Sequence, residues 1–254
     1  MLLKSFVVDN LEVSVFDSRD AMGKQAAEEA AAYLEEVIAK KGEATVIFAA
    51  APSQNEFLAA LAADSRVDWT KVTALHMDEY VGLPDDAPQG FGNFLRRAIF
   101  DKVPFKRVEF IGTTLAAEKA VARYDAILAG CHIDAVFMGI GENGHIAFND
   151  PHVADFKDPL RVKVVDLDEK CRMQQVHDGC FETFDEVPRY AVTLTCPTLT
   201  SADRLFCVVP AATKADAVKA MVFGPVSEAC PATALRCHRA AKLYLDADSG
   251  KYIL

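Results

Sequence analysis

The sequence predicts one α/β domain, with a doubly wound, mostly parallel sheet and helices on both faces. Short apolar segments alternate with longer amphipathic ones along the 254 residues, which is the βαβα pattern of a parallel sheet. Several short segments are apolar throughout, as expected of strands that helices cover on both sides. Because neither a repeat nor a linker divides the chain, residues 1–254 are treated as a single domain.

Each element is assigned from its hydrophobic pattern. The expected strands are short and apolar, and they cover residues 11–16, 45–51, 71–77, 107–111, 133–140, 190–195 and 204–209. The expected helices have Ala, Leu and charged residues at helical spacing, and they cover residues 18–41, 53–63, 91–102, 114–129 and 213–222. Gly42 ends the first helix. Residues 151–188 have the least regular pattern, so loops or a lid are expected there.

Composition and charge narrow the function classes. The chain is 51% hydrophobic and 25% charged, which is a globular composition and excludes a disordered protein, a collagen or a coiled coil. There are 27 Lys and Arg against 37 Asp and Glu, a net charge of −10, and no basic run exceeds two residues. This argues against nucleic acid or an anionic membrane surface as a partner. A small anionic ligand stays open, because a few local donors can hold it.

The cysteines and the N-terminus indicate a cytoplasmic protein. The seven Cys are scattered and form no Cys-x-x-Cys pair, so we interpret them as reduced, mostly buried thiols. The N-terminus lacks the pattern of an export signal, and no apolar run is long enough for a membrane helix. His145 with His152, and Cys237 with His238, lack a second spaced pair of ligands, so no metal is expected.

Candidate site residues follow three of the expected strands. In such sheets ligands bind beyond the carboxyl ends of the strands. Ser53, Gln54 and Asn55 follow residues 45–51, and Asp78 and Glu79 follow residues 71–77. The run from Gly141 to His145 follows residues 133–140. Its glycine spacing does not open a helix, so a dinucleotide cofactor is weakly supported and none is expected.

Asp78 and His145 are the candidate acid–base groups. A carboxylate shielded at a strand end has a raised pKa and can act as a base on a carbon acid, although Asp78-Glu79 alone could be a surface pair. In its loop His145 is the group that exchanges protons near neutral pH, and Asn143 and Asp150 could orient its ring. Taken singly, a structural histidine is the more frequent case.

Other groups of these loops could bind an anion. Gly141 and Gly144 would let backbone N–H groups approach it. Lys214 opens a helix after residues 204–209, where an ammonium and a helix N-terminus could together hold a phosphate. Ser53 could equally be a helix cap, and Lys214 a solvated surface group.

Two long motifs carry a resemblance to a known family. The run HMDEYVGLP at residues 76–84 is followed by GENGHIAFNDP at residues 141–151. Together with residues 187–191 and the turn at Lys214, they resemble glucosamine-6-phosphate deaminases (isomerases), within a wider superfamily that includes the 6-phosphogluconolactonases. The resemblance covers essentially the whole chain.

The resemblance implies a Rossmann-like fold, frequent homo-oligomers, and a reaction without metal or cofactor. An amino-sugar 6-phosphate and water become a ketose 6-phosphate and ammonia, so the enzyme is a deaminase with isomerase and hydrolase character in amino-sugar metabolism. By motif position, Asp78 would move a proton between C2 and C1, and His145 would open the sugar ring. Asp150 would support His145, and Lys214 would hold the phosphate.

The chain departs from the family pattern at four places around the substrate. Asn143 replaces an Asp; since an amide cannot balance an imidazolium, we expect N143D to speed ring opening. Asp150 replaces a longer Glu. The run Ala51-Pro52-Ser53-Gln54-Asn55 replaces a phosphate loop rich in Gly and Thr, so side-chain amides would take over from backbone donors. Gln175 stands where the family has a phosphate-binding Arg.

These departures leave the substrate open. The main hypothesis is a deaminase of glucosamine 6-phosphate or an epimer such as galactosamine 6-phosphate. A related isomerase acting on another sugar phosphate, or on one without an amino group, is the second. A 6-phosphogluconolactonase fits less well, because the runs around Asp78 and Asp150 argue against it. A non-catalytic sugar-phosphate sensor is the remaining alternative.

Overall fold

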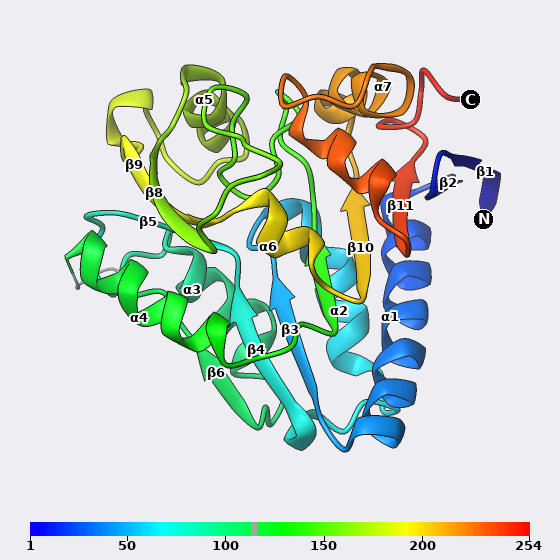
Figure 1. Ribbon diagram of the computed structural model, residues 1–254. Helices are drawn as coiled ribbons and strands as arrows, with labels where there is room; N and C mark the ends of the chain where they lie inside the picture. Colours follow the sequence, from blue (N-terminus) through cyan, green and yellow to red (C-terminus); the bar gives the residue numbers. More distant parts are fainter. Residues whose placement is uncertain (113–115) are drawn as a thin grey trace.

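A large, mostly parallel sheet is the frame of the computed structural model, which describes residues 1–112 and 116–254 (Figure 1). Within these residues its strands lie in the order β1 (Leu2–Val8), β2 (Leu11–Phe16), β11 (Ala241–Asp246), β10 (Arg204–Val209), β7 (Ala135–Met138), β3 (Ala44–Phe48), β4 (Val72–His76) and β6 (Arg107–Glu109). The edge strand β1 is antiparallel to β2, and the other neighbours pair in parallel. The predicted fold class is confirmed.

A smaller antiparallel sheet lies beyond the carboxyl ends of these strands, at the upper left of Figure 1. Its strands are β5 (Asp78–Tyr80), β9 (Tyr190–Leu194) and β8 (Val162–Asp166), in that order. Met77 joins the two sheets, because its N–H donates to Phe48 of the larger sheet and its carbonyl accepts from Leu194 of the smaller. Asp78 therefore stands at the junction between the sheets.

Helices cover both faces of the larger sheet (Figure 1). The first face carries α1 (Arg19–Lys41), α2 (Asn55–Ala63) and α3 (Phe91–Leu95), and the second carries α4 (Ala117–Ala129), α6 (Cys196–Thr200) and α7 (Ala215–Phe223). Strand β3 shows why its run is apolar throughout: Val46 and Phe48 pack under the helices of the first face, and Ile47 packs under those of the second.

The remaining helical segments are short. α5 (Glu169–His177) follows β8, and a π-helical turn η3 (Arg96–Phe100) continues α3. The 3₁₀ segments are η1 (Pro52–Gln54), η2 (Trp69–Lys71), η4 (Phe184–Glu186), η5 (Ala212–Lys214) and η6 (Pro231–Cys237). The long helix α1 has the ends that its sequence indicates, since the Ser18 hydroxyl accepts from the Ala21 N–H and Gly42 adopts a left-handed φ of 83°.

The structure differs from the expected elements in several places. β1, β11 and α6 were not expected, and the irregular stretch 151–188 contains β8 and α5. The hydrophobic pattern does not reveal α5, because polar Arg172, Gln174 and Gln175 are among its buried residues. The expected strand 190–195 is β9, in the antiparallel sheet. Of the expected helix 114–129, α4 begins at Ala117, while residues 114 and 115 lie outside the described residues.

The strand order places a binding crevice between β3 and β7. From β3 the chain proceeds to β4 and β6 on one side, and then returns to β7 on the other side of β3. The strand order reverses at this point, and in doubly wound sheets ligands bind at such a reversal. The loops that follow β3 and β7 carry the candidate residues Gln54 and His145.

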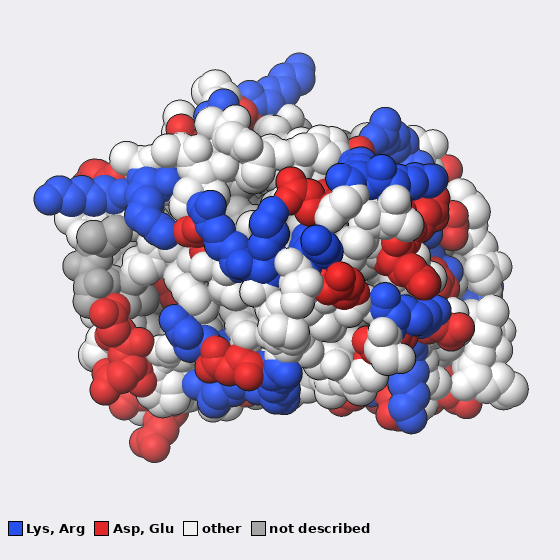
Figure 2. Space-filling model, turned by 90° about the horizontal axis from the view of Figure 1, so that it is seen from below, with Lys and Arg blue, Asp and Glu red and all other residues white. Residues whose placement is uncertain are grey.

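The opposite face, at the amino ends of the parallel strands, carries charges of both signs. Figure 2 shows blue and red side chains interspersed there rather than gathered into one basic area. Lys41, for example, pairs with Asp134 and Asp203. None of the helices within the described residues combines the length and apolarity that a membrane span requires.

Candidate active site

A cavity of about 1220 Å³ opens at the carboxyl ends of β3 and β7. Its wall includes Asp78, His145 and Lys214, which come from three separate parts of the chain. The candidates Ser53, Gln54, Gly141 and Gln175 line it too. The fold thus brings a carboxylate, an imidazole and an ammonium to the wall of one cavity.

Asp78 is a nearly buried carboxyl group, with 6% of the residue exposed. Its backbone is fixed by pairing with Thr193 across β5 and β9. Burial, and then the neighbouring charge of Glu79, raise the pKa of Asp78 well above its ordinary value. A carboxylate with a raised pKa holds a proton more strongly, so Asp78 suits a proton-abstracting role.

Glu79 turns away from the cavity and does not line it. Its carboxylate accepts from the backbone N–H groups of Tyr80, Phe91 and Gly92, at 3.0, 3.0 and 2.8 Å. Burial raises the pKa of Glu79, and these three donors oppose the rise. The sequence placed Glu79 among the substrate-binding residues, but its oxygens hold the start of α3 beside Asp78.

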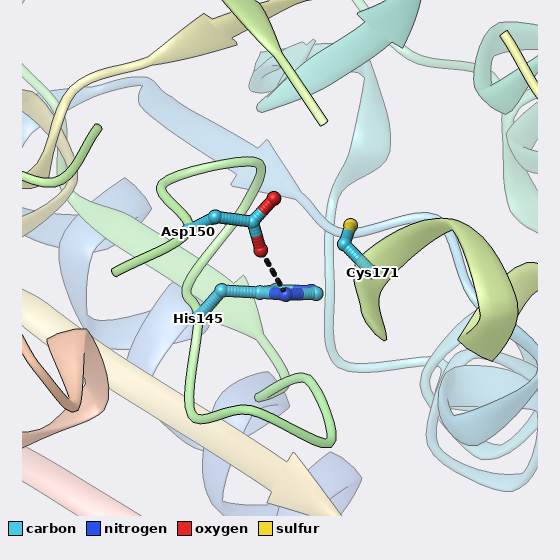
Figure 3. Close-up of side chains that lie close together, drawn as sticks. All are labelled: His145, Asp150 and Cys171. Atoms are coloured by element: carbon cyan, nitrogen blue, oxygen red, sulfur yellow. Dashed lines mark ion pairs between the residues drawn. The ribbon is translucent and has the colours of Figure 1, made fainter. Parts of the chain in front are cut away.

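His145 and Asp150 form an ion pair at the cavity wall (Figure 3). His145 Nδ1 lies 2.9 Å from Asp150 Oδ1, so the shorter Asp still reaches the ring. Burial would raise the pKa of Asp150, but hydrogen bonds and charge from His145, then bonds from Asn143 and the Asp168 N–H, bring it below its ordinary value. Asp150 is therefore a stable anion behind the imidazole.

Gly141 makes room for this imidazole. A Cβ at Gly141 would lie 2.2 to 2.4 Å from ring atoms of His145, so no other residue fits there without moving the ring. The N–H of Gly141 donates to His145 O, and the N–H of Gly144 donates to Gly141 O. Neither amide is available to an anion, which corrects the role expected for these two glycines. Gly144 instead provides a left-handed turn, at φ 84°.

Asn143 acts through the backbone and through carboxylates rather than on the His145 ring. Its Oδ1 accepts from the His145 N–H at 3.0 Å. Its Nδ2 donates to Asp150 Oδ1 and to Asp168 Oδ2, each at 2.9 Å. Asp168, which the sequence did not single out, is thereby part of the same network.

Cys171 of α5 lies beside the ion pair (Figure 3). One ligand-type atom from each of His145, Asp150 and Cys171 falls within 4.8 Å of the others. Burial, and then the charges of Asp150 and Asp168, raise the pKa of the Cys171 thiol well above its ordinary value. The thiol is therefore neutral near pH 7 and packs against the pair without adding charge.

Lys214 is the buried cation of the cavity, with 4% of the residue exposed. Among the described residues its Nζ has no hydrogen-bond partner. Burial lowers the pKa of Lys214, and the charges of Asp178 and Glu142 oppose the change. The turn that carries it is fixed by Asp246, whose carboxylate accepts from the Ala211 N–H. An anion in the cavity would supply the missing counter-charge.

The polar residues that follow β3 differ in the groups that they present to the cavity. Gln54 Nε2 donates to Val208 O at 3.0 Å and to Ser53 Oγ at 3.2 Å, while its Oε1 has no partner in the described chain. A free amide oxygen can accept from a sugar hydroxyl but does not attract a phosphate, which corrects the expected anion contact. Asn55 is exposed on α2 and does not line the cavity.

α5 forms part of the cavity wall, and of its residues there the sequence analysis named only Gln175. Gln174 and Gln175 line the cavity, and Gln174 Oε1 accepts from the Glu142 N–H at 2.8 Å. Arg172 is turned elsewhere: its guanidinium donates to Phe184 O and Val187 O. The sequence signal that could have revealed this helix is Asp168, an N-cap residue whose side chain accepts from the Cys171 N–H.

The α/β fold brings a buried carboxylate, an imidazole backed by a carboxylate and a buried ammonium together at its strand-order reversal. Such a set is typical of acid–base enzymes that act on small anionic substrates. Comparison with known proteins agrees with this class. The family model of glucosamine-6-phosphate isomerases/6-phosphogluconolactonases matches residues 17–244. The chain belongs to this family, as its two motifs indicated.

Relatives and solved structures make the likeness more specific. The glucosamine-6-phosphate deaminase of Bacillus thuringiensis (strain Al Hakam) is 35% identical over 207 residues, which cover 81% of this chain and 76% of that protein. A solved monomeric glucosamine-6-phosphate deaminase superposes with a TM-score of 0.86 at 26% identity, covering 94% of this chain and 98% of the other. The 6-phosphogluconolactonase of Trypanosoma brucei shares the fold, with a TM-score of 0.79 at 16% identity over 99% and 100% of the chains.

Proposed function

We propose that this protein deaminates and isomerises a hexosamine 6-phosphate, with glucosamine 6-phosphate as the first substrate to test. The observation that carries the proposal is the shared cavity of Asp78, His145 and Lys214. The 35% identity to a named deaminase supports the same substrate class.

The roles follow from where the groups lie. Lys214 would pair with the phosphate, because a buried ammonium without a partner gains most from a doubly charged ester. His145 would transfer a proton to the ring oxygen as the ring opens, with Asp150 stabilising the charged ring. Nothing in this scheme requires a donor from Glu79 or Asn55, which lie outside the cavity lining.

Asp78 would then carry out the carbon-acid chemistry. Ring opening gives an aldehyde at C1 next to the amino carbon C2. Asp78 takes the C2 proton while O1 gains a proton from solvent, which gives an enolamine. Asp78 then returns its proton to C1 while the amino nitrogen loses one to solvent, so that C2 becomes an imine. Water adds to this imine and ammonia leaves, which gives the ketose 6-phosphate. The raised pKa of Asp78 favours the abstraction.

The test is an ammonia-release assay on a panel of hexosamine 6-phosphates, with ketose formation followed in parallel. We expect ammonia and ketose in equal amounts from at least one amino sugar. Ketose formed from a substrate without an amino group, and no ammonia from the panel, would indicate an isomerase. Binding without turnover would indicate a sensor, and hydrolysis of 6-phosphogluconolactone in place of deamination would indicate a lactonase.

The same ammonia-release assay also shows which epimer of the hexosamine 6-phosphate the protein prefers. Gln54 Oε1 and Gln175 line the cavity and can contact sugar hydroxyls. A homo-oligomer stays a prediction, and size-exclusion chromatography with light scattering tests it.

A further inference from the structure

Asn143 sits between two carboxylates, and this explains why an amide occupies the position. Both hydrogens of Nδ2 are used, one toward Asp150 Oδ1 and one toward Asp168 Oδ2. The oxygen accepts from the backbone N–H of His145. An Asp at position 143 could accept that last bond but could donate neither of the others. It would also place a third carboxylate beside two existing ones.

Asp168 makes three hydrogen bonds, two of them to this network and one that caps α5. Its Oδ2 accepts from Asn143, its Oδ1 accepts from the Cys171 N–H at 2.6 Å, and its own N–H donates to Asp150 Oδ2 at 3.2 Å. Asp150 therefore has both oxygens occupied, one by Asn143 and His145 and the other by the Asp168 backbone. The residue that caps α5 also closes the network behind the imidazole.

We propose that Asp168 is a positioning residue of the active site, which acts through Asn143 to hold Asp150 against His145. It does not line the cavity, so its role would be to position other residues and not to contact substrate. The proposal rests on the proposed function for the step it serves, the proton transfer at His145. A carboxylate held at a fixed place behind a histidine keeps the ring oriented and stabilises it when charged.

The proposal reverses one expectation drawn from the sequence. Asn143 was expected to be a weaker substitute for Asp, with N143D faster at ring opening. In the structure the negative charge absent from position 143 is present at Asp168, one amide group away. N143D should therefore slow the reaction, because it breaks two hydrogen bonds and brings like charges together.

The first test separates positioning from capping. Asp168→Ser keeps a side-chain acceptor for the Cys171 N–H, since Ser is a good N-cap, but its short side chain loses Asn143. We expect kcat to fall about tenfold, a part of the 10²–10⁴-fold that positioned acid–base catalysis contributes. KM should stay near the parent value, because Gln174 and Gln175 of α5 keep their place. Parent-like kcat, or a loss confined to KM and melting temperature, would mean that Asp168 only caps the helix.

The second test exchanges the amide and the carboxylate. Asn143→Asp alone should lower kcat, and adding Asp168→Asn should restore part of the loss, because the amide introduced at position 168 can donate to the new carboxylate. The two changes would then be non-additive, as expected for contacting residues. Independent losses that multiply would overturn the proposal.

A substrate-free measurement keeps this inference separate from the proposed function. The Asp150 carboxyl carbon can be titrated by NMR in the free protein. The Asn143 donor helps to lower the pKa of Asp150, so N143D should raise its titration midpoint and the double variant should bring it back toward the parent. Equal midpoints in all three proteins would contradict the network even if the enzyme deaminates as proposed.

Discussion

Two groups of residues at the cavity are built on different principles. Around His145, every polar side-chain atom of Asn143 and both carboxylate oxygens of Asp150 have protein partners, although His145 Nδ1, which lies 2.9 Å from Asp150 Oδ1, makes no aligned hydrogen bond. In the second group, Lys214 Nζ and Gln54 Oε1 are buried without a partner among the described residues. The first group is held in place mainly by contacts within the protein, whereas the second presents polar atoms to a ligand. We therefore expect changes in the first group to act on kcat and changes in the second to act on KM.

The largest expected effect is that of Asp78→Asn. The substitution removes the base with little change in volume, so turnover should fall by about 10²–10⁴-fold or more. Binding of the sugar phosphate should be largely retained. Ammonia release measures the first quantity and isothermal titration calorimetry the second. Unchanged turnover would remove Asp78 from the mechanism.

Lys214→Met should weaken phosphate binding. A hydrogen bond to a charged group contributes about 1.5–3 kcal/mol, so KM should rise by about 10- to 100-fold with a smaller change in kcat. In the free protein the variant should be more stable at neutral pH, because burial lowers the pKa of Lys214 and its charge opposes folding there. Melting curves with and without inorganic phosphate test both parts. A parent-like phosphate effect on the variant would place the anion elsewhere.

Two carboxylates should affect stability in opposite directions. The pKa of Asp78 is raised, so its contribution to stability falls as pH rises above its unfolded value near 3.8, and Asp78→Asn should stabilise the protein at pH 7. The pKa of Asp150 is lowered, so its contribution is present above that value and disappears as pH falls through the folded pKa.

Asp150→Asn should accordingly destabilise the protein at pH 7 by about 1–3 kcal/mol, with a smaller difference from the parent in acid. Urea unfolding of both variants at pH 7 and at a pH well below 3.8 gives the comparison. Shifts of the same sign at pH 7 would contradict the difference in electrostatics between the two sites.

The smallest expected effect distinguishes two polar residues that the sequence placed together. Gln175 lines the cavity, so Gln175→Ala should raise KM by about 2- to 10-fold, the equivalent of one hydrogen bond. Asn55 is exposed outside the lining, so Asn55→Ala should leave KM near the parent value. Steady-state kinetics of the two variants measure both KM values. A larger rise in KM for Asn55→Ala than for Gln175→Ala would mean that the bound substrate contacts α2 outside the cavity and would contradict the proposed lining.

Local sequence patterns predicted the parallel core and the loops that meet at β3 and β7. Where a motif directly follows a strand, as for Asp78 and His145, the pattern gave its place in the fold, and both residues line the cavity; their roles stay predictions. They failed for α5, because a helix that buries Arg172, Gln174 and Gln175 shows no apolar stripe. They could not show that the amides of Gly141 and Gly144 are already used, since this depends on the exact path of the loop, or that Asp168 meets Asn143 across 25 residues, since this is a tertiary contact.

Proton exchange at C1 of the ketose 6-phosphate product is the most direct test of the role of Asp78. The purified protein would be incubated with the ketose and an ammonium salt in D₂O, since the imine at C2 forms only when ammonia adds, and the C1 hydrogens would be followed by NMR. We predict that the parent exchanges a C1 hydrogen for deuterium and that Asp78→Asn falls to the rate without protein. Exchange by Asp78→Asn as fast as by the parent would contradict this role.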